Sequence, residues 1–340
     1  CFRRFLQMLK FEVKNKIAMN TIPEKTKALV LEAYNTNLIR AMRALKLTEL
    51  EIPKPKAGEV LGKIEAAPVN PSDIAFLMGG YNIEKQLPAT PGFEGSGTIV
   101  QTGNGVDQKL LDQRVCFYTQ VDHGGTWAEY SIVPEKNCLP LRDGLPKEQA
   151  ACMFVNPLTA YGLTEHVFQN RHSAVILSAA NGQVGSFVRF FCREKKVKVI
   201  NLVRKEKHVK ELHEQGEEFV LNTTFEDFTD ALQRMATDLN ATAAIDAVGG
   251  DFTGKLINQM PAGSEVILYG GLSGMPVSAI DPLQIIFKNK VLGGFNLGDW
   301  LQEKSKEELG KIAKYIELLF LEEKLKTQIQ AVYPLDDFYQ

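Results

Sequence analysis

The sequence predicts an α/β protein with two units, a β-rich unit followed by a doubly wound parallel sheet. From Lys27 to about Leu141, short strand-forming runs are separated by Gly, Pro and Asp. After Leu145, helical segments alternate with short apolar runs, which is typical of a parallel sheet covered on both faces. A chain of 340 residues also fits two domains better than one. We expect a basic N-terminal extension at 1–26, a β-rich domain at 27–146 completed by about 326–340, and a doubly wound domain at 147–325.

The strands of the first unit are predicted from β-type runs. They are KALVL at 27–31, LKLTELEI at 45–52, VLGKIEAAPV at 60–69, GSGTIV at 95–100, RVCFYT at 114–119 and AEYSIV at 128–133. Residues 71–73 (Pro-Ser-Asp) suit a helix start, since Pro fixes φ and Ser or Asp can cap free N–H groups. Gly79 and Gly80 then end the helix and leave Tyr81 on a loop, where chemistry is often presented.

The second unit is predicted from short apolar strands between helices. The strands are SAVILS at 173–178, KVKVINLV at 196–203, EEFVLN at 217–222, TAAIDAVG at 242–249, SEVILYGG at 264–271 and VLGGF at 291–295. Residues 301–325 carry apolar side chains on one stripe and predict a single amphipathic helix. Residues 327–335 (TQIQAVYPL) predict a final strand that returns to the first domain.

The segment at 175–204 predicts a dinucleotide site, because it reads as strand, glycine-bearing turn, helix and second strand. A phosphate would lie at the helix N-terminus, where free N–H groups favour an anion, and Gly182 and Gly185 remove Cβ atoms that would block it. Ala179 stands where the first glycine of G-x-G-x-x-G is expected. The alternative interpretation is a structural turn without a ligand.

The residue that closes the second strand indicates which nicotinamide cofactor binds. An acidic residue there would bind the ribose hydroxyls and repel a 2′-phosphate, whereas Arg204 beside Lys205 attracts one. We therefore expect NADPH. The alternative is that Arg204 is a solvated surface charge.

Composition excludes several function classes. Hydrophobic content of 44% and charged content of 24% are typical of a soluble globular protein. A net charge of −2 provides no global field that would attract nucleic acid or an anionic membrane. The five cysteines are scattered without a C-x-x-C pair, which disfavours disulfide frameworks and zinc knuckles and indicates a reducing compartment. No apolar run approaches the length of a membrane span.

The first twenty residues are basic, with five cationic side chains against one acid, Glu12, and apolar residues at helical spacing. This composition is similar to part of an organellar transit segment. It also fits an ordinary basic extension. We expect a mitochondrial location, with a cytoplasmic one as the alternative.

Several separated blocks resemble the medium-chain dehydrogenase/reductases from Lys27 onward. The blocks are AAPVNPSD with GGY and LPATPGFEG, GTWAEYS from Gly125, VNPLTAYGL from Val155, VINLVR from Val199, VILYGGLSGMPV from Val266 and IIFKNKVLGGFNLGDW ending at Trp300. The similarity is greatest to the zinc-free mitochondrial trans-2-enoyl-thioester reductases. It implies a β-rich GroES-like catalytic domain and a Rossmann-type NADPH domain. It also implies a helix and a strand after PLDDFYQ, so we expect a longer natural chain.

The resemblance implies NADPH-dependent reduction of the C2=C3 bond of 2-enoyl thioesters carried by coenzyme A or acyl carrier protein, with mitochondrial fatty-acid synthesis as the expected setting. Hydride would add to the β-carbon, and Tyr81 would supply the proton, since a phenol stays protonated at neutral pH. Two alternatives stay open, a zinc-free quinone or alkenal reductase and an enzyme-derived structural subunit of a larger assembly. The family also implies a homodimer that pairs sheet edges near 266–295.

The resemblance further implies the cofactor contacts. They are Asn156, Asn181, Gly182, Gln183, Val184, Arg204, Lys205, Tyr269, Gly270, Gly271, Leu272, Phe295, Asn296 and Leu297. Gly182 with Gln183 replaces the more usual Ser–Gly pair. Phe93 stands where the enoyl reductases more often have Asn, and Asn296 stands where they more often have an aromatic residue.

The zinc-dependent members of this superfamily use a cysteine near the position of Asn70 and a G-H-E motif near Gly92. Here Phe93 replaces the histidine and cannot ligate a metal, and the four-cysteine lobe is missing. The five histidines lack the spacing of a metal site. We therefore expect no catalytic zinc.

Overall fold

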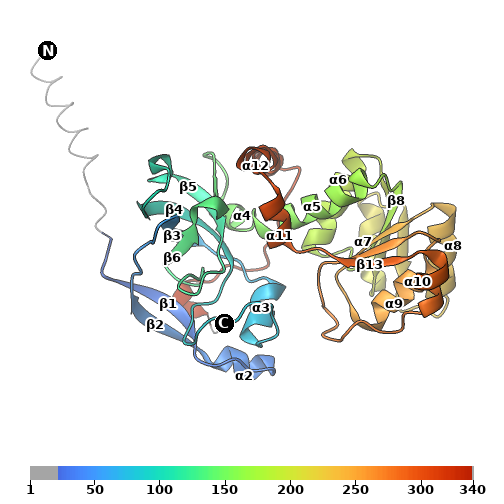
Figure 1. Cartoon of the computed structure of the whole chain (residues 1–340), viewed down its shortest axis with the longest axis horizontal. Coiled ribbons are helices and arrows are strands. Elements are labelled where there is room, and N and C mark those ends of the chain that lie inside the picture. The colour runs from blue at the N-terminus through green and yellow to red at the C-terminus, as the bar shows by residue number, and fades with distance from the viewer. Residues whose placement is uncertain (1–21, 339–340) are drawn as a thin grey trace, which may run out of the picture.

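The computed structural model describes residues 22–338, which form two units joined through a central group of helices (Figure 1). One unit is an antiparallel sheet with a separate hairpin, and the other is a parallel sheet covered by helices. The predicted α/β class is confirmed, with a GroES-like β unit and a Rossmann-type unit.

The first unit contains a two-stranded hairpin and a five-stranded antiparallel sheet in the order β6-β3-β4-β5-β7. The hairpin pairs β1 (Lys25–Leu31) with β2 (Leu45–Glu51). The sheet strands are β3 (Glu59–Ala66), β4 (Glu94–Thr102), β5 (Arg114–Tyr118), β6 (Tyr130–Pro134) and β7 (Cys138–Pro140). Each predicted run of the first unit contributes to one of these strands.

The second unit is a six-stranded sheet in the order β10-β9-β8-β11-β12-β13, and each neighbouring pair is parallel. The strands are β8 (Ala174–Leu177), β9 (Lys198–Val203), β10 (Phe219–Asn222), β11 (Ala243–Asp246), β12 (Glu265–Leu268) and β13 (Val291–Gly294). The strand order reverses between β8 and β11. A ligand of such a sheet binds outside the carboxyl ends of the strands at this reversal.

Helices cover both faces of this sheet because consecutive residues of its central strands are apolar, so both faces carry apolar side chains, as in β8 (Ala-Val-Ile-Leu). Val175 and Leu177 of β8 belong to a core with α5 (Val155–Gln169), α6 (Gln183–Glu194) and α12 (Lys306–Leu321). Ala174 and Ile176 belong to a second core on the opposite face. That core contains α8 (Phe228–Asp238) and α9 (Gly250–Gln259). The remaining helices are α2 (Leu38–Arg43), α3 (Pro71–Leu77), α4 (Lys147–Ala151), α7 (Glu206–Glu214), α10 (Pro282–Lys288) and α11 (Leu297–Glu303).

The single helix predicted at 301–325 is wrong, because two helices, α11 and α12, occupy this region. Ser305 separates them. Its hydroxyl accepts from the N–H of Glu308 at 3.2 Å, and the Glu308 carboxylate accepts from the N–H of Ser305 at 3.0 Å. This reciprocal cap starts a new helix, and its sequence signal is the pattern S-x-x-E at 305–308.

The strand predicted at 327–335 is also wrong, although the segment does return to the first unit. Its backbone binds glutamine side chains instead of a strand: Thr327 exchanges two hydrogen bonds with Gln149, at 2.9 and 3.0 Å. Beyond it, Asp336 forms an ion pair with Lys27 of β1 at 2.8 Å, and Leu335 packs against the core under the hairpin. Residues 335–336 therefore lie beside the first unit, near β1.

In the described part of the chain, none of the helices combines the length and apolar character needed to cross a membrane. The basic segment at 1–20 lies outside the described residues, so its interpretation as a transit segment stays a prediction.

Candidate functional site

Tyr81 lies on the loop that follows α3, as its position after Gly79 and Gly80 predicts. Its ring stacks on Phe93 with centroids 5.2 Å apart. Phe93 is fully buried and also meets the edge of Phe76 from α3, at 5.4 Å. Aromatic packing therefore fixes the plane of the Tyr81 ring.

The Tyr81 hydroxyl hydrogen bonds with Tyr118, at the end of β5, and with Gln120 just beyond it. Burial raises the pKa of Tyr81 above its ordinary value, and the hydrogen bond with Gln120 opposes this rise. The phenol is thus protonated at neutral pH. The two hydrogen bonds also stabilise the oxygen when its proton leaves.

A buried polar network lies next to Tyr81 and joins the two units. The Asp73 carboxylate accepts from the N–H groups of Asn70 at 2.7 Å and Phe93 at 3.1 Å. The Asn70 amide donates to Glu94 at 3.0 Å and accepts from Asn156 of α5 at 3.3 Å. Burial raises the pKa of Asp73 and of Glu94 to about 7.

Glu94 fastens the first unit to the start of α5. One of its oxygens accepts from the backbone N–H groups of Phe154 at 2.9 Å and Val155 at 2.6 Å. A carboxylate at this position satisfies free donors at the helix start and interacts favourably with the helix dipole. This role was missed in the sequence, because sixty residues separate Glu94 from the helix that it caps.

The zinc ligand positions of the superfamily are thus occupied by a hydrogen-bonding amide, Asn70, and a packed ring, Phe93. In residues 22–338, no group of three or more His, Cys, Asp or Glu side chains is placed to hold a metal ion. A cavity of about 310 Å³ lies between β1 and residues 122–125, and its walls contain none of the predicted site residues.

The turn between β8 and α6 has the backbone that a dinucleotide site requires. Ala179, in place of the first glycine, adopts the left-handed conformation with φ of 47°, which an L-residue adopts only at some cost. A Cβ at Gly185 would lie 2.6 Å from the carbonyl oxygen of Ala180, so only glycine allows this close packing. In the described structure, the N–H groups of Gln183 and Val184 have no acceptor. These free donors at the helix start fit a phosphate.

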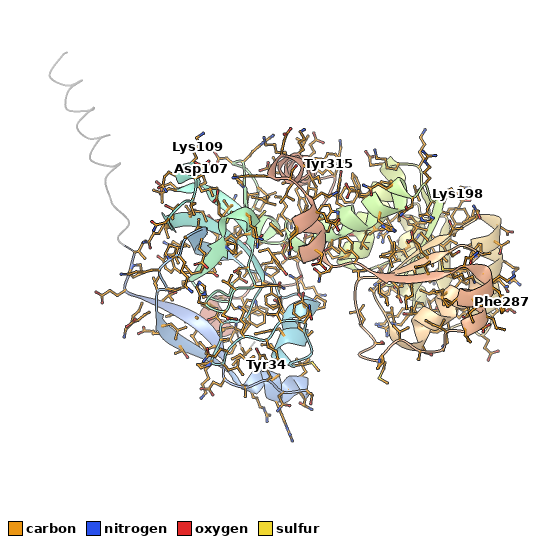
Figure 2. All side chains as sticks on the ribbon, in the orientation of Figure 1. Tyr34, Asp107, Lys109, Lys198, Phe287 and Tyr315 are labelled. Carbon is orange, nitrogen blue, oxygen red and sulfur yellow. The ribbon has the colours of Figure 1, made fainter. Side chains whose placement is uncertain are left out.

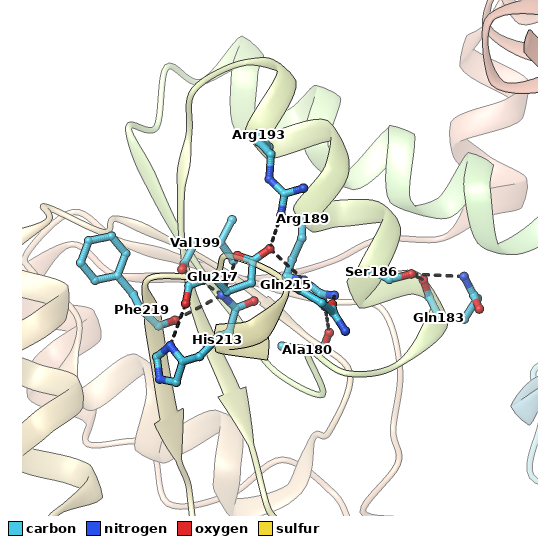
Figure 3. Close-up of polar contacts among 11 residues, drawn as sticks. Ala180, Gln183, Ser186, Arg189, Arg193, Val199, His213, Gln215, Glu217 and Phe219 are labelled. Carbon is cyan, nitrogen blue, oxygen red and sulfur yellow. Dashed lines mark hydrogen bonds and ion pairs between the residues drawn. The ribbon is translucent and has the colours of Figure 1, made fainter. Parts of the chain in front are cut away.

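A buried arginine, Arg189, supports this turn (Figure 3). The Arg189 guanidinium donates to the carbonyl oxygen of Ala180, to Gln215 at 2.9 Å and to Glu217 at 3.2 Å. Glu217 also accepts from Arg193 at 2.7 Å. The Ala180 carbonyl is thereby held by the protein. The sequence signal for this contact was weak: an arginine among the apolar residues of α6.

The side chain of Gln183 binds the C-terminal segment. Its amide donates to the carbonyl of Lys326 at 3.2 Å and accepts from the N–H of Gln328 at 2.9 Å. The side chain of Gln183 is therefore hydrogen bonded within the protein, and only its backbone N–H is available to a phosphate. Asn181 and Gly182, which directly precede Gln183, are exposed.

Arg204 and Lys205 follow directly after β9, and both side chains are exposed. Among residues 22–338, no carboxylate forms an ion pair with either of them. The guanidinium of Arg204 is thus available to an external anion.

The remaining predicted contacts lie at the carboxyl ends of β12 and β13, on the same edge of the sheet as the β8 turn. Leu272 donates to the carbonyl of Ala247 at 2.9 Å, which places residues 269–272 (Tyr-Gly-Gly-Leu) beside the end of β11. Phe295 packs against α5, where a Cβ at Gly162 would lie 2.6 Å from its ring. Asn296 caps α11 by accepting from Asp299 at 3.1 Å, and Leu297 is the first residue of that helix. Within the described residues, no hydrogen bond joins this group directly to Tyr81.

Asp246, at the end of β11, connects several loops at this edge of the sheet, a role that was not predicted from the sequence. It is fully buried and accepts from Ser178 at 2.6 Å, Thr253 at 2.7 Å and the N–H of Val248 at 2.9 Å. An acidic residue at the carboxyl end of an apolar strand was the sequence signal that could have indicated this role of Asp246. It joins the loops after β8 and β11 and stiffens the edge where the sheet order reverses.

Both units match family models. Residues 56–143 match the alcohol dehydrogenase GroES-like domain, and residues 184–314 match the zinc-binding dehydrogenase domain.

Whole-chain relatives agree with these domain matches. The chain is 30% identical over 306 residues to the mitochondrial enoyl-[acyl-carrier-protein] reductase of Xenopus tropicalis, covering 87% of this chain and 86% of that protein. It is 32% identical over 290 residues to the enzyme of the same description from Caenorhabditis elegans, covering 83% and 81%. A crystal structure of a Mesorhizobium loti protein assigned as an NADPH:quinone reductase superposes with a TM-score of 0.87 at 31% identity, covering 93% and 94%. The chain therefore belongs to the medium-chain dehydrogenase/reductase superfamily of oxidoreductases.

Proposed function

We propose that this protein reduces the C2=C3 double bond of 2-enoyl thioesters with NADPH. The observation that carries the proposal is the placement of Tyr81: a protonated phenol, held by ring stacking, whose oxygen is hydrogen bonded by Tyr118 and Gln120. Two relatives that are at least 30% identical are described as enoyl-[acyl-carrier-protein] reductases, which supports the same substrate class here.

The residues of the Rossmann-type unit fit a phosphorylated dinucleotide. The free N–H groups of Gln183 and Val184 would hold the pyrophosphate, and Arg204 with Lys205 would hold the 2′-phosphate. Residues 269–272 and 295–297 would line the nicotinamide side, and Asn156 would approach it from the start of α5. When bound, NADPH supplies the hydride that adds to the β-carbon.

Tyr81 would complete the reaction by giving its proton to the α-carbon. Positioned acids of this kind contribute roughly 10²–10⁴-fold to the rate. The hydrogen bonds with Tyr118 and Gln120 stabilise the phenolate that remains until solvent returns a proton.

The test is a turnover assay of wild type beside Tyr81→Phe, with crotonyl-coenzyme A and NADPH. The variant keeps the ring that stacks on Phe93 and loses only the hydroxyl. We expect kcat to fall at least about 100-fold while the Kd for NADPH, measured by fluorescence, changes less than about twofold. Tyr118→Phe is the control, because it keeps Tyr81 and removes one neighbour; a smaller fall is expected. Equal kcat for wild type and Tyr81→Phe would refute the role of Tyr81.

A second candidate function is quinone or alkenal reduction, which the similarity to the Mesorhizobium loti structure favours. The two functions differ only in the acceptor. Side-by-side assays with enoyl thioesters and small quinones separate them, and oxidation of NADPH by quinones alone would refute our first choice. A purely structural subunit would bind no NADPH in the same titration.

We also propose a homodimer formed through β13, which is an edge strand of the parallel sheet. Large apolar side chains are exposed on and beside this edge. They include Leu272 at 59%, Met275 at 67%, Ile286 at 62%, Phe287 at 72% and Val291 at 56% exposure (Phe287 is labelled in Figure 2). An apolar patch next to an unpaired strand edge is typical of an interface.

A mitochondrial location and a place in mitochondrial fatty-acid synthesis follow as proposals from the descriptions of the relatives. Imaging of the chain with a C-terminal fluorescent tag tests the location. A diffuse cytoplasmic signal would favour the alternative.

A further inference from the structure

The loop that carries Tyr81 also contains a buried lysine, Lys85, which the proposed reaction does not use. The residue is only 3% exposed. Lysine side chains are almost never buried to this degree unless an anion pairs with them. Its sequence context, in a loop between Glu84 and Gln86, indicates a surface position.

The groups that contact the ammonium of Lys85 are neutral. It donates to the carbonyl oxygen of Thr90 at 3.3 Å and to that of Gly124. It also lies 5.8 Å from the ring centroid of Phe93 and 5.9 Å from that of Phe76. Both distances are within the range of cation–π attraction.

The backbone of Lys85 is fixed as well. Its N–H donates to the hydroxyl of Tyr34 at 2.8 Å, and that hydroxyl donates to the carbonyl of Lys85 at 3.1 Å. Tyr34, labelled near α2 and α3 in Figure 2, meets the edge of Phe76 at 5.4 Å. The middle of the loop is thus held through both its backbone and its side chain.

No carboxylate forms an ion pair with Lys85 among residues 22–338. Burial lowers the pKa of Lys85 to about 8, while Asp122 and Asp73 act in the opposite direction. A buried charge without an ion-pair partner costs folding free energy, and an apolar side chain of similar size is often no less stable. The charge therefore needs an explanation other than the stability of the fold.

The contacts of Lys85 converge on Tyr81 from two directions. The ring of Phe93 contacts the ammonium and also stacks on Tyr81. Gly124 belongs to the loop at 119–126, which supplies Gln120 to the Tyr81 hydroxyl. Lys85 therefore ties the loop that carries Tyr81 to the loop that binds its oxygen.

We propose that Lys85 is a positioning residue, which fixes the Tyr81 phenol for proton transfer by joining residues 78–93 to residues 119–126. This inference rests on the proposed function. A displacement of about 1 Å at a reacting group can lower a rate about 100-fold, so a loosened loop would have a large effect on turnover.

The test compares Lys85→Met with a matched control, Lys290→Met, in the purified full chain. Lys290 is also 3% exposed, and its ammonium donates to the carbonyls of Ile257 at 2.7 Å and Asn258 at 3.3 Å, in the other unit. Both substitutions remove a buried ammonium with two carbonyl partners. Only Lys85 lies in the loop that carries Tyr81.

For Lys85→Met we expect kcat with crotonyl-coenzyme A to fall about 10- to 100-fold, with the Kd for NADPH within about twofold of wild type. Amide hydrogen exchange should become faster at 78–93 and 119–126. Lys290→Met should change neither kcat nor exchange in these two loops.

Turnover within about twofold of wild type, or unchanged exchange in both loops, would overturn the inference for Lys85. A fall in kcat matched by an equal loss of NADPH affinity would also overturn it, because the damage would then be general. If wild type reduces no thioester, the proposed function fails separately, and the exchange measurement still decides whether Lys85 holds the loops.

Discussion

Replacement of Arg204 by alanine should weaken the binding of NADPH, the proposed cofactor, about tenfold and leave the binding of NADH almost unchanged. Arg204 follows the end of β9, its side chain is exposed, and within residues 22–338 no carboxylate neutralises it. A hydrogen bond to a charged group typically contributes about 1.5–3 kcal/mol. Solvent screening at an exposed position favours the lower end of this range. We therefore expect the Kd for NADPH to rise about tenfold in Arg204→Ala.

NADH lacks the 2′-phosphate, so its Kd should change less than about twofold in the same variant. The assay is a fluorescence titration with both cofactors at low and high salt, since the contribution of a surface charge should shrink as salt rises. Arg234→Ala is the matched control, because Arg234 is an exposed arginine on α8. Equal losses of NADPH and NADH affinity in Arg204→Ala would refute the reasoning, and so would an NADPH effect of the same size in Arg234→Ala.

Three further outcomes are expected. The pKa of Lys85 is lowered to about 8 in the folded protein, so between about pH 8 and 10.5 the unfolded chain binds more protons than the folded protein. The free energy of unfolding of wild type, measured by urea denaturation, should therefore rise with pH in this range relative to Lys85→Met, by up to about 1.4 kcal/mol per pH unit. A difference between the two proteins that stays constant with pH would contradict this. Phe287→Ser should shift the protein to monomers in analytical ultracentrifugation, because it removes the most exposed apolar ring of the proposed interface; a monomeric wild type would refute the dimer. Gly185→Ala should weaken binding of both NADPH and NADH about equally, since its Cβ would lie 2.6 Å from the Ala180 carbonyl, and unchanged affinity for both would show that the turn can adapt.

The architecture could be predicted from local sequence patterns, because reading such patterns requires no knowledge of which distant residues come into contact. The short apolar run in 173–178 (SAVILS), placed between helical segments, predicted a strand of a sheet covered on both faces, and β8 indeed contributes Val175 and Ile176 to different cores. The elements that failed did so for identifiable reasons. The apolar stripe at 301–325 predicted one helix, although Ser305 carries the signal for a new helix start. Residues 327–335 have strand-forming side chains, but the backbone at Thr327 binds a glutamine amide and not a neighbouring strand.

The candidate site was predictable in its parts and not in its connections. The motif order predicted that Tyr81 lies on a loop after a helix and that Arg204 follows a strand, and the structure has both arrangements. The Glu94 cap of α5, the Arg189 contact to Ala180 and the burial of Lys85 were not foreseen. Each depends on which backbone carbonyl or N–H group the fold brings within hydrogen-bonding distance.

The sequence alone determined the class of fold, the dinucleotide turn and the cation after the second strand, since residue type and spacing specify helix starts, strands and tight turns locally. Only the tertiary structure decided that Gln183 binds the segment at 326–328, across 145 positions of sequence, and that Lys85 is buried against Phe93. A polar side chain can face solvent or bind a partner in the interior. Which of the two it does depends on contacts between segments that are far apart in the chain, and the residues around it in the sequence give no sign of these contacts.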